Sequence, residues 1–167
     1  VDSEGNRHIS YRDSNNLDLK YAYGPSGPND ISWQLYSVDG NGIDVGEYTS
    51  LAVDNSGNRH ISYYDSTTFD LKYAYGPAGT GDISWQLYSV DTPGDVGLYT
   101  SIAIHPNTQK PSISYFKNNG TGSNEIRIAT QTSDSDTTWE IGVLDGSLNI
   151  FFANGNSQLK IDDNNDI

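Results

Sequence analysis

The residues best suited to chemistry in this chain are carboxylates that lie in stretches rich in glycine and asparagine. The candidate ligands are Asp39, Asn41, Asp44, Asp91 and Asp95. Carboxylate and amide oxygens in such loops are the ligands that calcium prefers in proteins. The segment DGNGID at 39–44 lacks the full D-x-[DN]-x-[DN]-G-x5-E calcium loop. We therefore consider two hypotheses: that these side chains bind calcium, or that they stabilise turns by hydrogen-bonding the backbone.

Residues that could support catalysis are duplicated, whereas a catalytic site is normally unique. His8 and His60 occupy the same place in two copies of one motif, GNRHISY. Nucleophilic catalysis needs a nucleophile, a base and an orienting group in one site, and glycoside hydrolysis needs two carboxylates across a sugar site. Recognition of a substrate carboxylate also needs converging arginines. The chain's arginines are Arg7, Arg12, Arg59 and Arg127. We therefore predict that this chain is not an enzyme.

The composition limits the partners of this chain. Lys and Arg total 9 against 22 Asp and Glu, which gives a formal net charge of -13. So acidic a surface repels nucleic acid and anionic lipid. No apolar run approaches the roughly 18 residues of a membrane span, so we expect no membrane insertion. The chain has no cysteine, hence no thiol chemistry. Asn119 begins an N-G-T sequence and is a candidate glycosylation acceptor.

All of these residues lie in a chain whose sequence repeats, so the fold of the repeated unit determines where they lie. Residues 1–41 and 53–93 are identical at 30 of 41 positions. A weaker third copy contains PSISYF at 111–116, EIRIAT at 125–130 and TWEIGVLD at 138–145. A fixed period of this size predicts a repeat architecture. We divide the single segment 1–167 into repeats 1–52, 53–103 and 104–160, with the start of a further repeat at 161–167.

Each repeat contains four short runs in which apolar and polar residues alternate. In the second repeat these runs are 48–54, 59–65, 71–76 and 84–90. Clusters of Gly, Asn, Asp and Pro separate them, and no stretch has a helical period of 3.6 residues. We therefore predict an all-β chain with almost no helix. Its units match the four-stranded blades of a β-propeller, with about 52 residues between the first two copies.

The phase of the repeat predicts a ring that is incomplete within one chain. If the strands of a blade are named A to D from axis to rim, the chain order is B-C-D-A, three times over. We expect a partial ring or half of an assembled ring, so that two chains close six blades, or a window on a longer array. The strand edges at RHISYR (7–12) and SQLKID (157–162) are left unpaired. These open edges predict self-association.

Aromatic residues recur at equivalent positions of the repeats. Trp33, Trp85 and Trp139 each lie in the fourth strand of a unit. We expect them to fill the space between blades, and a ring of ligand-stacking aromatics is the alternative. The pairs Tyr21/Tyr23 and Tyr73/Tyr75 alternate on one strand face, which predicts packing.

The pattern GNRHISYYDS…LKYAYGP…SWQLYSVD resembles the tandem propeller repeats of secreted bacterial and archaeal proteins, described as sialidase-like or BNR-like. The resemblance covers nearly the whole chain. It implies a propeller architecture and a secreted or cell-surface location, and it implies no particular activity.

From these observations we expect a non-enzymatic binding or scaffold module. Near-identical blades present near-identical surfaces, which favours multivalent binding of a glycan or protein partner, or self-assembly. The alternative is a fragment of a carbohydrate-active, sialidase-like enzyme whose catalytic residues lie outside this chain.

Overall fold

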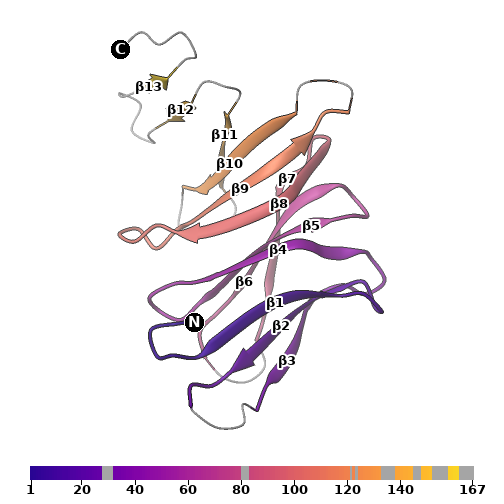
Figure 1. Cartoon of the computed structure of the whole chain (residues 1–167), viewed down its shortest axis with the longest axis vertical. Helices are drawn as coiled ribbons and strands as arrows, with labels where there is room; N and C mark the ends of the chain where they lie inside the picture. Colours follow the sequence, from indigo (N-terminus) through magenta and orange to yellow (C-terminus); the bar gives the residue numbers. More distant parts are fainter. Residues whose placement is uncertain are drawn as a thin grey trace.

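A computed structural model of the chain describes residues 1–27, 32–79, 83–120, 122, 124–132, 138–144, 148–151 and 158–161. Within these ranges all regular structure is β-strand and no helix occurs, so the all-β prediction is confirmed. The strands form three antiparallel sheets, which Figure 1 shows stacked one above another along the molecule.

The three sheets follow the repeats of the sequence. The first sheet contains β1 (Arg7–Asp13), β2 (Asp18–Gly24) and β3 (Gln34–Asp39) in that order. The middle sheet contains β4 (Val45–Val53), β5 (Arg59–Asp65), β6 (Asp70–Gly76) and β7 (Gln86–Asp91). The third sheet contains β8 (Asp95–Ile104), β9 (Pro111–Asn118), β10 (Glu125–Gln131), β11 (Trp139–Leu144), β12 (Leu148–Phe151) and β13 (Gln158–Ile161). The strand that we expected to be innermost therefore begins the second and third sheets.

The pairing register is the same in each copy of the repeat. Ile9 lies opposite Ala22, Ile61 opposite Ala74, and Ile113 opposite Ala129. Because side chains alternate along a strand, a shared register places equivalent residues on the same face of each sheet. Every sheet thus presents the same two faces to its neighbours.

Stacking explains why nearly the same sequence is buried to different degrees. β1 and β5 differ in a single residue, yet β5 is buried along its whole length, whereas β1 is half-buried with one exposed residue. The middle sheet has a neighbour on both sides, and the first sheet has a neighbour on one side (Figure 1). Burial in this fold therefore depends on the presence of an adjacent sheet.

The hydrophobic core lies between the sheets, in two clusters. The first is formed by Leu19, Tyr21, Tyr23, Val38, Val45, Ile61, Tyr63 and Ala74. The second is formed by Leu71, Tyr73, Val96, Ile102, Ile113, Tyr115 and Ala129. Leu19 in the first cluster and Leu71 in the second occupy equivalent positions, so the two clusters repeat one design. The expected packing role of the tyrosines on β2 and β6 is confirmed.

Two glycines let each sheet approach the next. A Cβ atom on Gly97 of β8 would lie 2.7 Å from the Cα of Leu71, and one on Gly46 of β4 would lie 3.0 Å from the Cα of Leu19. Both glycines also have φ angles in the left-handed region, +99° and +91°. The glycine before each "YTS" motif is thus required twice over, for backbone conformation and for close approach.

The C-terminal part differs from the sequence-based expectation. Of SQLKID, the described residues form β13, which pairs with β12 from Leu148↔Ile161 to Phe151↔Gln158. The prediction that this strand has no partner within the chain is therefore wrong for one of its edges. The reason is the apolar run that contains β12, which the repeat pattern did not mark as a strand. Residues 162–167, the rest of the expected further repeat, lie outside the described residues.

The sheets do not close into a ring within the chain. The first sheet has three strands and the last strand of the third sheet pairs with β12 alone among the described strands. That these sheets are blades of a propeller, and the division into repeats, stay predictions.

Candidate functional site

The carboxylates proposed as calcium ligands all have protein partners. The hydroxyl of Tyr63 donates to Asp39 over 2.7 Å, and that of Tyr115 donates to Asp91 over 2.7 Å. Arg127 also donates to Asp91, over 2.8 Å. Burial, and next the charge of Asp39, raise the pKa of Tyr63 well above its usual value. Each aspartate thus ties the end of one sheet to the strand of the next.

The other two aspartates, Asp44 just before β4 and Asp95 at the start of β8, pair with strand residues of the preceding sheet. Arg12 pairs with Asp44 at 2.7 Å, and Tyr64 donates to Asp95 over 2.8 Å. Asn118 donates to the same carboxylate over 3.0 Å. Among the described residues no group of three or more His, Cys, Asp or Glu side chains is placed to hold a metal ion. Asn41, the fifth candidate ligand, lies in the loop between β3 and β4 and has a left-handed φ of 65°. The calcium site stays a prediction.

Asn119 lies in an exposed part of the loop between β9 and β10, as expected for a glycosylation acceptor. Its side-chain amide donates to Glu125 over 3.0 Å. Glycosylation at this position stays a prediction.

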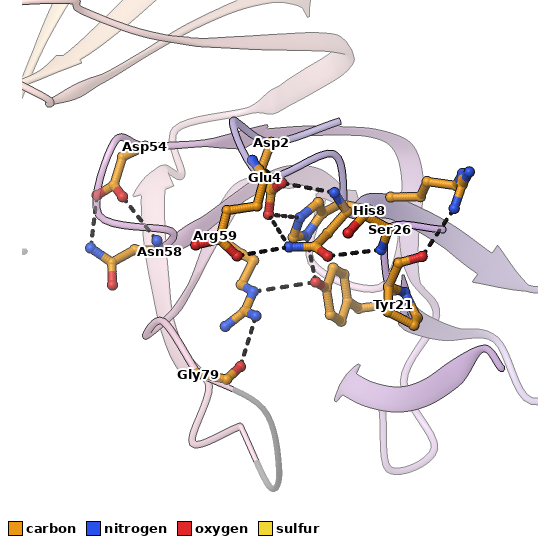
Figure 2. Close-up of polar contacts among 12 residues, drawn as sticks. Asp2, Glu4, His8, Tyr21, Ser26, Asp54, Asn58, Arg59 and Gly79 are labelled. Atoms are coloured by element: carbon orange, nitrogen blue, oxygen red, sulfur yellow. Dashed lines mark hydrogen bonds and ion pairs between the residues drawn. The ribbon is translucent and has the colours of Figure 1, made fainter. Parts of the chain in front are cut away.

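The first two repeats each build a buried chain of polar groups around their histidine, shown for the first repeat in Figure 2. His8 contacts Asp2 through Nε2 at 3.0 Å and Tyr21 through Nδ1 at 2.7 Å. Because a carboxylate only accepts, Nε2 carries the proton and Nδ1 accepts from the Tyr21 hydroxyl. Arg59 of the middle sheet donates to the same hydroxyl over 3.2 Å. The chain therefore crosses from the first sheet to the second.

Carboxylate, imidazole and hydroxyl in line are the groups of a nucleophilic triad, but their burial shows a structural role here. The Tyr21 side chain is 0% exposed, so no substrate reaches its hydroxyl. The second repeat has the same arrangement, with His60 at 2.7 Å from the Tyr73 hydroxyl and 3.4 Å from Asp54. The interpretation of the duplicated histidines as structural is supported by this geometry.

The buried polar chains make stability sensitive to acid. Burial lowers the pKa of His8, an effect that Asp2 partly offsets, so the imidazole is neutral in the folded state. Burial alone raises the pKa of Asp54, but hydrogen bonds from Asn58 and His60 outweigh it and lower the pKa. A lowered carboxyl pKa stabilises the fold above the unfolded value of about 4, and this contribution is lost as the pH falls through the folded value.

We expect the free energy of unfolding to fall below about pH 6.5, where an unfolded histidine takes up a proton, and to fall further below about pH 4. The Asp54→Asn variant removes one of the carboxylates responsible. Its free energy of unfolding should depend less steeply on pH between about 2 and 4 than that of the parent. Urea unfolding at a series of pH values measures both slopes. Equal slopes for variant and parent contradict the role assigned to Asp54.

Two of the three tryptophans fill the space between sheets, as expected. Trp85 packs edge-on against Tyr21 of the first sheet, with ring centroids 5.4 Å apart. Trp139 packs in the same way against Tyr73 of the middle sheet, at 5.1 Å. Trp33, which has no sheet before it, is 40% exposed. The three tryptophans are equivalent in the sequence, but their burial differs because their sheets have different positions in the stack.

The most accessible aromatic cluster lies on β4 and β8, and the sequence analysis did not single it out. Tyr48 is 39% exposed and Tyr99 is 67% exposed, with ring centroids 4.5 Å apart. Both have left-handed φ angles, 50° and 55°. Such angles are costly for a bulky residue and are concentrated at functional sites. The pairing register shifts just before each tyrosine and again across it, as at β-bulges, which re-aim side chains.

The strained pair is held from both sheets. Thr100 donates to the carbonyl of Tyr48 over 2.9 Å, and its hydroxyl lies 2.7 Å from that of Ser62. Tyr64 flanks Tyr48 at 6.1 Å between ring centroids, and Phe116 flanks Tyr99 at 6.2 Å. We call Tyr48, Tyr64, Tyr99 and Phe116 the aromatic platform.

Carboxylates border the aromatic platform. The pKa of Tyr48 is raised by burial, then by its contact with Tyr99 and by the charges of Glu47 and Asp95. Burial and the hydrogen bond to Asp95 raise the pKa of Tyr64 as well. At neutral pH the platform is therefore uncharged, and hydrogen-bond acceptors lie at its border. The feature of the sequence that could have indicated the platform is the motif G-x-Y-T-S, which occurs at 46–50 and again at 97–101.

Comparison with known proteins places this chain in no family. No protein-family model matches it, and no curated protein matches it significantly. Solved structures that resemble it include a fucose lectin from Kordia zhangzhouensis in complex with methyl-fucoside. The TM-score is 0.48 and the sequence identity 17%, and the match covers 85% of this chain and 94% of the lectin chain. A likeness at this level assigns neither a fold family nor a ligand to this chain.

In the part of the chain that the structure describes, no helix has the length and apolar character needed to cross a membrane.

Proposed function

We propose that this chain is a non-enzymatic recognition module of a secreted or cell-surface protein, part of a β-propeller, and that it binds saccharides on the aromatic platform. The observation that carries the proposal is the pair Tyr48 and Tyr99, exposed side by side on two strained bulges. A strained residue persists where its surroundings impose it, and here the same strain is imposed in two repeats. A duplicated exposed aromatic suits binding better than catalysis.

The chemistry of the platform suits a sugar. A pyranose has a face of C–H groups, which packs on an aromatic ring, and a border of hydroxyl groups, which donate to carboxylates. Glu47 and Asp95 supply charged acceptors next to the rings. Hydrogen bonds to an ionised acceptor are about twice as strong as neutral ones. Two equivalent tyrosines on neighbouring sheets favour a ligand with more than one sugar unit.

The charge of the chain narrows the ligand further. A net charge of -13 repels sialylated, sulfated and phosphorylated glycans at long range. The platform's carboxylates would also lie next to any acidic group on the ligand. The expected ligands are therefore neutral glycans or amino sugars.

A glycan array probed with labelled protein tests this function. We expect neutral or amino-sugar glycans to bind and acidic ones to be absent. The Tyr99→Ala variant should lose at least about fivefold in affinity, because stacking on an aromatic contributes about 1 kcal/mol or more. Trp33→Ala is the matched control, since Trp33 is an exposed aromatic (40%) just before β3 of the first sheet, outside the strands that carry the platform. Equal loss in both variants, or none in Tyr99→Ala, contradicts the proposal.

The competing function, a fragment of a carbohydrate-active enzyme, makes a different prediction for the ligand's fate. Mass spectrometry of the bound glycan after prolonged incubation separates the two classes. Recovery of the intact glycan supports recognition, and release of a shorter sugar supports the enzyme.

A further inference from the structure

The first sheet leaves uncovered a face that its two equivalents bury. Ile9 of β1 is 46% exposed, whereas Ile61 and Ile113 at the same position are 0% exposed. Leu35 is 67% exposed, and its equivalents Leu87 and Ile141 are 41% and 40% exposed, so this position lies at the border of the face. Together with Trp33, these residues form an apolar surface at the N-terminal end of the stack. We call Ile9, Tyr11, Trp33 and Leu35 the open face.

The chain itself shows what covers such a face. In the middle sheet Ile61, Tyr63 and Trp85 pack against Leu19, Tyr21 and Tyr23 of the first sheet. In the third sheet Ile113, Tyr115 and Trp139 pack against Leu71 and Tyr73 of the middle sheet. In both internal interfaces this face therefore packs on the opposite face of the preceding sheet.

The opposite face is uncovered at the other end of the stack. Leu19 and Leu71 are 0% exposed, but Ile126 at the equivalent position on β10 is 45% exposed. Ile128 next to it lies in the register position of Tyr21 and Tyr73, because all three are opposite an equivalent serine of the preceding strand. The described part of the chain thus presents both halves of an interface that it forms twice internally.

We propose that the open face docks on the outer face of the third sheet, around Ile126 and Ile128, of a second copy of this chain. The contact repeats the relation between the first and middle sheets. It joins different surfaces of the two copies, so a second such contact closes a dimer if the rotation fits and otherwise gives a longer assembly. Neither the open face nor the pair Ile126 and Ile128 includes Tyr48 or Tyr99, so the proposal does not rest on saccharide binding.

The composition of the two faces predicts how the association responds to salt. The third sheet has isoleucine where the first has tyrosine, so the hydrogen bond from Arg59 to Tyr21 has no counterpart in this contact. Each copy carries a net charge of -13, which opposes association. Salt screens this repulsion, so the complex should become tighter as ionic strength rises.

Size-exclusion chromatography with light scattering, over a range of protein concentrations and at about 0.05 and 0.5 M NaCl, tests the proposal. We expect an association that increases with concentration and with salt. Ile9→Asp and Leu35→Asp should each weaken it at least tenfold. Leu17→Asp is the matched control, because Leu17 is an exposed leucine (38%) in the turn after β1 and its left-handed φ of 61° suits aspartate.

Circular dichroism melts of the dilute variants verify that they fold, and Leu35→Asp tests the surface even if Ile9→Asp does not fold. Association that survives in the control and is lost in the open-face variants supports the proposal. A chain that stays monomeric at all concentrations and salts overturns it. So does association that is unchanged in Leu35→Asp, or a Trp33→Ala variant that loses glycan binding while its association is unchanged.

Discussion

Replacing Trp85 with alanine is expected to lower the free energy of unfolding by about 3–5 kcal/mol, the usual cost of deleting a buried aromatic side chain. Trp85 packs on Tyr21 across the first interface, 5.4 Å between ring centroids. It also lies against Gly76, where a Cβ atom would be 2.6 Å from its ring. Removal leaves a cavity between two sheets that the surrounding strands cannot easily fill.

Trp33→Ala is the matched control, in the same local sequence but with a 40% exposed side chain. We expect it to change the free energy of unfolding by less than about 1 kcal/mol in dilute protein. Urea unfolding followed by circular dichroism gives both values. Equal effects at the two positions contradict the claim that sheet stacking, rather than the local sequence, decides burial.

Replacing Gly97 with alanine is expected to cost roughly 2–5 kcal/mol. A left-handed φ costs about 1–2 kcal/mol for a residue with a Cβ atom, and overpacking costs about 1–3 kcal/mol more. At Gly97 both apply, since φ is +99° and the new Cβ atom would lie 2.7 Å from the backbone of Leu71. Backbone cannot rotate away as a side chain can, so the third sheet must shift from the middle sheet.

Gly42→Ala separates the two causes. Gly42 has φ of +90° but nothing within 4 Å of the new Cβ atom, so it carries only the conformational cost. The difference between the two variants in thermal or urea unfolding measures the cost of crowding the interface. A Gly97→Ala variant no less stable than Gly42→Ala contradicts the close approach of β8 to β6.

The repeat in the sequence predicted most of the fold, because stacked copies must satisfy the same pattern. Strand positions and the packing of Tyr21 and Tyr73 follow from alternation within a recurring unit. The role of Trp85 follows in the same way. The exposure of Trp33 does not, because it depends on which sheet has a neighbour rather than on local residues. The pairing of β12 with β13 was missed because it lies outside the repeat pattern.

The candidate site was harder to predict than the fold. In the sequence Tyr48 and Tyr99 resemble ordinary strand residues, and their exposure results from a backbone bulge that no alternation pattern encodes. The aspartates were proposed as calcium ligands because they lie in stretches rich in glycine and asparagine. In the structure Asp39 and Asp91 accept hydrogen bonds from buried tyrosines, so their conspicuous positions have a structural use.

The central claim is that the aromatic platform binds a saccharide, and isothermal titration tests it most directly. The best neutral glycan from the array is titrated, in dilute protein, into the parent, the Tyr48→Ala, Tyr99→Ala double variant and the Trp33→Ala control. We predict saturable binding to the parent and the control, and about thirtyfold weaker binding to the double variant, about 2 kcal/mol. Unchanged affinity in a folded double variant contradicts the account.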